Sequence, residues 1–148
     1  MDIIVDIDGT LADCTHRLYH IQKNPKDWDL FFAVCRNDAP IMVVLVMVRD
    51  LSRNADNRII FCSGRPERTR PQTREWLDEW LEFDAAKIDL YMRADKDHRD
   101  DQIVKRELLW RIRSDGYNPV LAIDDRARVC KMWREEGLIC AQVADGDF

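Results

Sequence analysis

Three short segments of the sequence carry the side chains best suited to metal and phosphate chemistry. Asp6-Ile7-Asp8-Gly9-Thr10, Ser63-Gly64-Arg65 and Asp124-Asp125-Arg126 each follow directly after a short apolar run. If those runs are parallel strands, their carboxyl ends meet at one edge of a sheet, where four carboxylates, a hydroxyl and an arginine converge. Like charges held within a few ångströms require a neutralising cation or a bound proton. The pattern therefore predicts a site for Mg²⁺, a hard ion that prefers oxygen ligands, with phosphate as the expected substrate group.

Each of these residues, taken singly, also has a purely structural explanation. An Asp at a strand end is commonly a turn or helix cap, Ser63 can be a plain turn residue, and Arg65 can face solvent at a helix start. Asp101 and Lys105 have the spacing of an exposed helix pair. Their stripe continues at Leu108, however, and this apolar continuation indicates the inward face of the helix. The coincidence of all these residues at one predicted edge favours a functional site.

The elements that must position these residues follow the pattern of an α/β protein. Apolar runs without polar alternation are typical of strands covered on both faces, and stretches with helical spacing separate them. The sequence therefore predicts a doubly wound, Rossmann-like parallel sheet of five strands with helices on both faces. The expected strands are residues 3–7, 58–62, 88–92, 120–123 and 139–143, and the expected helices start at Pro40, contain Trp76 to Leu81, run from Asp101 to Ile112 and stop at Gly137.

Residues 14–39 do not fit this alternation. They carry aromatic side chains among charges and contain no run that is typical of a strand. We expect a small helical cap here, inserted between the first strand and its crossover helix, within a single domain that spans residues 1–148. Trp28, Phe31 and Phe32 in this insertion have two interpretations: they stack on a terminal base of a substrate, or they form the insertion's own core.

Composition and charge narrow the classes of partner. The 148 residues include 23 Lys and Arg against 28 Asp and Glu, and the net charge of −5 gives no overall positive field to hold a long nucleic-acid backbone. Any polynucleotide must therefore be bound through local contacts. The longest apolar run, Ile41 to Val48, is far shorter than the roughly 20 residues of a membrane span, so no membrane contact is expected. Five cysteines without a C-x-x-C pair indicate free thiols in a reducing compartment, which predicts a cytoplasmic protein.

The motifs resemble a known family as a set. Asp6-Ile7-Asp8-Gly9-Thr10, Ser63, Lys105 and Asp124-Asp125 are similar to the four motifs of the haloacid dehalogenase (HAD) superfamily, whose members are mostly Mg²⁺-dependent phosphatases. The closer resemblance is to the 3′-phosphatase domain of phage polynucleotide kinase-phosphatase, since Arg17 and Asp101 also fall where that domain has functional residues. The resemblance covers nearly the whole chain and is weakest in the insertion. No G-x-x-x-x-G-K-[ST] phosphate loop occurs, so the kinase half of such proteins is absent from this sequence.

The resemblance implies a catalytic role for three residues. Asp6 attacks phosphorus and forms an aspartyl-phosphate, and Asp8 protonates the leaving oxygen and later activates water. Lys105 balances the charge of the phosphate and of Asp6. On this mechanism we expect the surroundings of Asp8 to favour its acid form and Asp6 to stay charged beside the metal.

The same resemblance implies the groups that bind substrate and metal. Ser63, Gly64 and Arg65 are expected to contact the phosphate, with Arg17 as a further substrate-binding residue and Asp101 holding the amine of Lys105. The expected Mg²⁺ ligands are Asp6, the backbone carbonyl of Asp8, Asp124 and Asp125.

The resulting expectation is a Mg²⁺-dependent phosphomonoesterase that acts on the 3′-phosphorylated ends of DNA or RNA, in company with a separate kinase or ligase. The same catalytic residues would serve a small-molecule phosphatase, such as a 5′- or 3′-nucleotidase, because the insertion decides what reaches the metal. A third alternative is a non-catalytic binding module. It is disfavoured because every charged residue of the motifs is present.

Overall fold

The computed structural model describes residues 1–81 and 88–146. Its centre is the predicted five-stranded sheet, in the order β5-β4-β1-β6-β7, and every neighbouring pair is parallel. The central strand is the first in the chain, so both of its neighbours arrive by crossovers on opposite faces. The strands are β1 (Asp2–Val5), β4 (Arg58–Pro66), β5 (Asp89–Arg93), β6 (Pro119–Asp124) and β7 (Ile139–Gln142).

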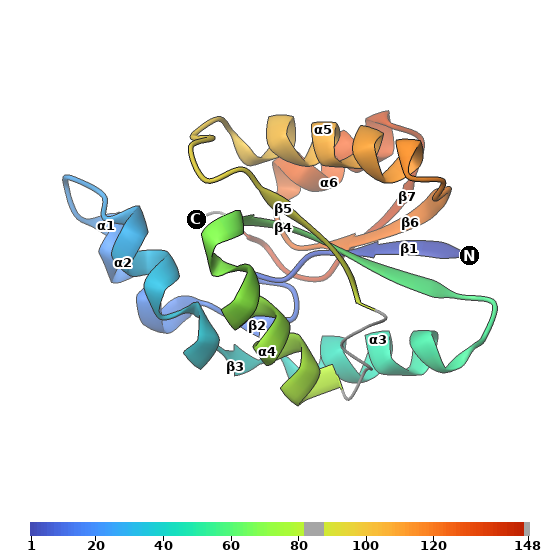
Figure 1. Cartoon of the computed structure of the whole chain (residues 1–148), viewed down its shortest axis with the longest axis horizontal. Coiled ribbons are helices and arrows are strands. Elements are labelled where there is room, and N and C mark those ends of the chain that lie inside the picture. Colours follow the sequence, from blue (N-terminus) through green and yellow to red (C-terminus); the bar gives the residue numbers. More distant parts are fainter. Residues whose placement is uncertain (82–87, 147–148) are drawn as a thin grey trace.

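Helices cover both faces of the sheet, as predicted (Figure 1). Side chains alternate along a strand, so Ile3 and Val5 of β1 pack in one hydrophobic cluster and Ile4 packs in the other. Fully buried tryptophans fill the two layers, Trp76 in the first and Trp133 in the second. The first layer contains α3 (Met42–Arg53) and α4 (Arg70–Leu81), and the second contains α5 (Asp101–Ser114) and α6 (Ala127–Glu135).

The insertion extends from the carboxyl end of the sheet, opposite the chain's N-terminus (Figure 1). It contains two short helices, as predicted, around a small core of Cys14, Ile21 and Phe31. An antiparallel ribbon of two residues on each side flanks the segment and closes the insertion at its base, and only Ala39 of this ribbon falls within the predicted bounds of residues 14–39. The elements are β2 (Ala12–Asp13), α1 (Tyr19–Gln22), α2 (Trp28–Ala33) and β3 (Ala39–Pro40).

Several boundaries differ from the predicted ones for local reasons. β1 ends at Val5 because the backbone turns at the following motif, and α3 begins at Met42 because Pro40 pairs in β3. β7 is an edge strand whose Ile139 is 75% exposed, so it is not covered on both faces as its apolar sequence suggested. Gly137 ends α6 with a φ of +89°, as expected of a helix stop. Within the described residues, no helix is both long and apolar enough to cross a membrane.

Candidate active site

The turn after β1 brings the first motif to the carboxyl edge of the sheet. The amide of Asp6 still donates to the carbonyl of Ile123 on β6 at 3.0 Å, so this aspartate leaves the sheet in register with its neighbour strand. Gly9 then adopts a φ of +84°, and a Cβ at this position would lie 2.2 Å from Oδ2 of Asp125. Glycine is therefore required both by the turn and by the close approach of Asp125.

Three carboxyl groups from two neighbouring strand ends meet at this edge. Ligand oxygens of Asp6, Asp124 and Asp125 all lie within 4.8 Å of one another. Burial raises the pKa of Asp6 well above its usual value, and the carboxylates of Asp124 and Asp125 add to this effect against the opposing charge of Lys105. Burial and the neighbouring Asp124 carboxylate also raise the pKa of Asp125 to about 6. The cluster carries more negative charge than its surroundings neutralise.

Lys105 is the cation closest to this cluster. The side chain is 1% exposed, and Nζ donates to Oδ1 of Asp6 at 2.7 Å and to Oδ2 of Asp124 at 2.9 Å. Asp101, one turn earlier on α5, lies 3.5 Å from the same nitrogen. Burial alone would lower the pKa of Lys105, but the carboxylates of Asp124, Asp6 and Asp101 outweigh it and raise the pKa well above its usual range. Lys105 is therefore held as an ammonium ion beside the carboxylate of Asp6.

Asp8 points away from the acid cluster and towards two buried arginines. Its Oδ1 accepts from Nη2 of Arg17 at 2.6 Å and from Nε and Nη2 of Arg65 at 2.9 and 2.5 Å. Burial would raise the pKa of Asp8, but the guanidinium groups of Arg65 and Arg17 lower it to about 2. The expectation that the surroundings favour the acid form of Asp8 is thus wrong for the substrate-free protein, because each arginine lies behind this carboxylate and stabilises its ionised form.

A residue that sequence reasoning missed holds the two arginines in place. Asp38, at the end of the insertion, is buried, and it accepts from Nε and Nη2 of Arg17 at 2.8 and 2.7 Å and from Nη2 of Arg65 at 2.7 Å. The backbone carbonyl of Asp38 accepts in turn from the indole of Trp76 at 2.8 Å. No local motif marks Asp38, because its partners come from three separate parts of the chain.

Further hydrogen bonds orient the acids of the site. The indole of Trp133 donates to Oδ2 of Asp124 at 3.0 Å, and the hydroxyl of Thr10 lies 3.2 Å from Oδ2 of Asp6. Arg93, at the end of β5, donates to Oδ1 of Asp101 at 2.9 Å. Trp133 carries the signal of a core residue in the sequence, and its additional role follows only from the packing of α6 on β6.

The second motif lies at the end of β4, beside the first. Ser63 is fully buried, and its hydroxyl accepts from the amide of Arg65 at 3.2 Å. Gly64 lines the open cleft, and a Cβ at this position would lie 2.5 Å from Oδ1 of Asp101. The missing side chain therefore lets α5 approach β4 closely enough to place Asp101 and Lys105 in the site.

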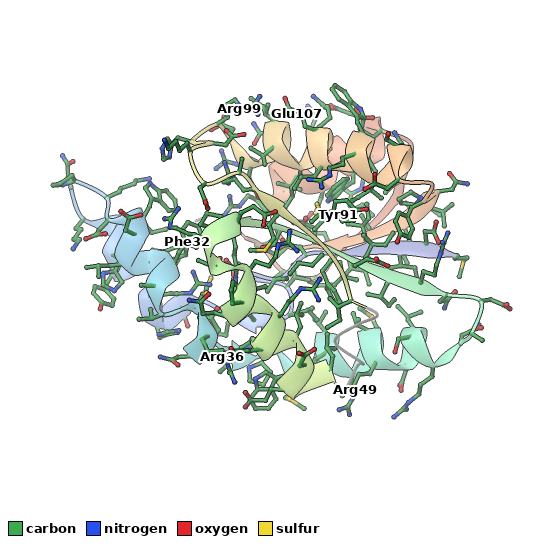
Figure 2. All side chains as sticks on the ribbon, in the orientation of Figure 1. Phe32, Arg36, Arg49, Tyr91, Arg99 and Glu107 are labelled. Carbon is green, nitrogen blue, oxygen red and sulfur yellow. The ribbon has the colours of Figure 1, made fainter. Side chains whose placement is uncertain are left out.

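The site opens into a cleft between the insertion and the loop that follows β5. This cavity has a volume of about 370 Å³ and is lined both by Asp6, Asp8 and Lys105 and by Trp28 and Phe32 of α2. In Figure 2, Phe32 lies between the insertion helices and the start of α4. Six of the predicted site residues thus line one cavity: Asp6, Asp8, Gly64, Asp101, Lys105 and Asp125. The other four, Ser63, Arg17, Arg65 and Asp124, are fully buried and do not line it.

The donor set fits the metal that the motifs imply. Asp6, Asp124 and Asp125 supply only carboxylate oxygens, which suit Mg²⁺ and not a softer transition metal. Within the described residues, this is the group of acidic side chains that meets the geometry of a metal site. The side chain of Asp8 is not part of the cluster, and a role for its backbone carbonyl remains a prediction.

The doubly wound sheet, the insertion after β1 and the acids at the strand ends define a phosphatase of the HAD fold. The family model for the phosphatase domain of the polynucleotide kinase PNKP matches residues 1–148, and the chain therefore belongs to this family. A solved chain from the Pnkp1/Rnl/Hen1 complex is 29% identical with a TM-score of 0.79, and the match covers 99% of this chain and 47% of that one.

Two further proteins are similar to most of this chain. A protein of Autographa californica nuclear polyhedrosis virus, named as a bifunctional polynucleotide kinase/RNA ligase, is 30% identical over 133 residues, which are 90% of this chain and 18% of the viral protein. The class C acid phosphatase of Bacillus anthracis is 15% identical and shares the fold, with a TM-score of 0.63 over 99% of this chain and 67% of its own. The chain spans less than half of the first two relatives.

Proposed function

We propose that this protein removes 3′-phosphate groups from the ends of DNA or RNA, as a Mg²⁺-dependent phosphomonoesterase that forms an aspartyl-phosphate intermediate. The observation that carries the proposal is the position of Asp6. Its carboxylate lines an open cleft and lies close to the ammonium of Lys105 and to the carboxyl groups of Asp124 and Asp125. A nucleophile, a cation and a metal-binding oxygen set thus lie together at this cavity.

In this proposal Asp6 is the nucleophile and Asp8 is the general acid and base. Asp6 attacks phosphorus in line, the bond from phosphorus to the 3′-oxygen breaks, and Asp8 protonates that oxygen as it leaves. In the second step Asp8 accepts a proton from water, which attacks the aspartyl-phosphate and releases inorganic phosphate from Asp6. Lys105 keeps Asp6 oriented throughout, because the ammonium bonds both to Asp6 and to Asp124.

The arginine pair keeps Asp8 beside the leaving group. Arg17 and Arg65 both donate to Oδ1 of Asp8, so its other oxygen is available to exchange a proton with substrate. In the free protein this carboxyl is ionised, with a pKa of about 2. A phosphate dianion bound nearby raises that pKa by like-charge repulsion and so favours uptake of the proton that the first step needs.

The bound cation completes the site. Asp6, Asp124 and Asp125 would hold Mg²⁺, with the carbonyl of Asp8 as a further ligand. When bound, Mg²⁺ neutralises the phosphate charge and the excess charge of these acids. Gly64 and Lys105 line the same cleft and would contact the phosphate beside the metal.

Substrate preference tests the proposal directly. Purified protein with Mg²⁺ is given a 3′-phosphorylated oligonucleotide and, separately, 3′- and 5′-mononucleotides, and released phosphate is measured over time. We expect a higher kcat/KM for the oligonucleotide. A preference for free nucleotides would assign the site to a nucleotidase, and the matched control is Asp6→Asn, which separates this activity from a contaminant.

The family supports a place in nucleic-acid end repair. Its structural relatives come from complexes described as Pnkp1/Rnl/Hen1 and as an RNA repair complex. A 3′-phosphate blocks end joining, so we propose that a separate kinase or ligase acts on the same ends. The five cysteines are free, which suits a reducing compartment, and we propose the cytoplasm.

A further inference from the structure

The three aromatic residues of the insertion have different surroundings. Phe31 is 2% exposed and packs in the insertion core, where the guanidinium of Arg17 lies 4.2 Å from its ring centre. Trp28 is 44% exposed and lines the cleft together with the half-buried Phe32. The rings of Trp28 and Phe32 are nearly parallel, at 22° and 6.0 Å between centres. Phe31 therefore belongs to the core, whereas Trp28 is a large apolar ring exposed in the cavity that contains Asp6.

Two cations at the same cleft have no acidic partner among residues 1–81 and 88–146. Lys26 lies 5.7 Å from the ring centre of Trp28, and Arg128 lines the cleft from the start of α6. Neither side chain makes an ion pair in the part of the chain that the structure describes, whereas Arg68, which also lines the cleft, is bonded to Asp29. In a protein with a net charge of −5, a lysine beside an exposed aromatic ring and an arginine that lines the same cleft indicate an anionic ligand that also has an aromatic group.

We propose that Trp28 is a stacking platform for a nucleobase near the 3′ end of a single-stranded polynucleotide, and that Lys26 and Arg128 contact its phosphodiester backbone. The inference rests on the proposed function, because the terminal phosphate at Asp6 sets the direction in which the strand crosses the cleft. A nucleotide carries a phosphate, a sugar and a flat base, and the same cavity is lined by the acid site and by the indole of Trp28. Stacking is tolerant of sequence because every base has an aromatic face.

The platform is tested by binding without turnover. A 5′-fluorescein-labelled tetranucleotide with a 3′-hydroxyl end, which is the product of the proposed reaction, is titrated with protein and followed by anisotropy. The same strand with abasic sugars at its last two positions is the paired probe. In the wild type we expect the complete strand to bind about 5- to 100-fold more tightly than the abasic one.

Variants assign this difference to one side chain. Trp28→Ala should reduce the ratio of the two dissociation constants to near 1, and Trp28→Phe should restore part of it. Trp110→Ala is the matched control, since Trp110 is 55% exposed on α5 and does not line the cleft, and it should leave the ratio unchanged. A ratio near 1 in the wild type, or one that persists in Trp28→Ala, overturns the proposal.

The backbone contacts have a separate measurement. Lys26→Ala and Arg128→Ala should each flatten the slope of log affinity against log salt by about 0.7, the value expected for one single-strand phosphate contact. Lys131→Ala, whose lysine pairs with Glu135 on α6, should leave the slope unchanged. An unchanged slope in both cleft variants removes the backbone contacts from the proposal.

These binding results are distinguishable from a failure of the proposed function. That function fails if the wild type releases no phosphate from 3′-phosphorylated strands.

Discussion

Strand β1 has an aspartate at its start and another directly after its end, and the two carboxyl groups have opposite pKa shifts. Asp2 accepts from Nε and Nη2 of Arg58 at 2.7 and 2.8 Å and from the amide of Asn118 at 2.6 Å. Burial opposes ionisation of Asp2, but these bonds and the charge of Arg58 lower its pKa. Burial and neighbouring acids instead raise the pKa of Asp6 well above its usual value.

The difference separates a carboxylate that stabilises the fold from one that is kept for a ligand. Asp2 forms an ion pair with Arg58, and its hydrogen bonds connect the starts of β1, β4 and β6. Asp6 shares the single ammonium of Lys105 with Asp124 and Asp101. Uncompensated buried charge costs folding free energy, so its presence at one end of the strand marks that end as the functional one.

The largest expected difference between the two ends concerns turnover. Asp6→Asn keeps the shape of the side chain but removes the nucleophile, and it should lower kcat by about 10⁴-fold or more. Asp2→Asn should leave kcat unchanged, because its partners lie at the opposite edge of the sheet. Phosphate release from a 3′-phosphorylated oligonucleotide is the measurement. Equal losses in both variants would mean that the two ends do not differ in function.

Metal removal should affect only the functional end. Chelation followed by gel filtration should lower turnover by at least about 10²-fold, since a bound divalent ion supplies several kcal/mol of charge stabilisation, and added Mg²⁺ should restore it. Added Mg²⁺ should also raise the melting temperature of the wild type and of Asp2→Asn equally. Asp124→Asn should lose most of that rise. Full turnover in the chelated protein would contradict the metal assignment.

A smaller effect is expected where a side chain acts through Asp8. Arg65→Lys keeps the positive charge but loses the fork that bonds Asp8 and Asp38 together, and kcat should fall about 10- to 100-fold. Arg113→Lys, on the exposed side of α5, is the matched control and should be neutral. If Arg65→Lys changed KM alone, the arginine would contact substrate and not position Asp8.

The smallest expected effect is on stability at the amino end. Asp2→Asn should lower the free energy of unfolding at pH 7 by about 1–3 kcal/mol, because it weakens buried hydrogen bonds to a charged group. Folding lowers the pKa of Asp2, so its contribution is present above the ordinary value of 3.8 and is lost as pH falls through the lower folded value. Urea unfolding of both proteins should therefore show a gap that narrows below pH 3.8. A gap that widens in acid would contradict this sign.

The sequence was sufficient for the parts of the site that lie at strand ends. Asp6 and Asp124 follow apolar runs, and parallel strands bring their carboxyl ends together whatever the details of packing. The first motif also contains Gly9, the residue type that a sharp turn at the end of β1 favours. Lys105 needed both the helical stripe of α5 and the family resemblance.

The remainder depends on packing that no local pattern records. Asp38 has no motif, and it gains its role only because the insertion folds back and meets Arg17 and Arg65. The lowered pKa of Asp8 follows from the same arrangement and opposes the expectation from its catalytic role. The ribbon β2–β3 is two residues long on each side, which is too short to leave an alternating pattern in the sequence.

The short base of the insertion has a consequence for how the substrate selectivity of this protein could be altered. Arg17 bonds both Asp38, which directly precedes the ribbon, and Asp8, whereas α1 and α2 project beyond the ribbon and α2 carries the exposed ring of Trp28 (Figure 1). Grafting a different loop between those two anchors would exchange selectivity while the reactive groups keep their positions.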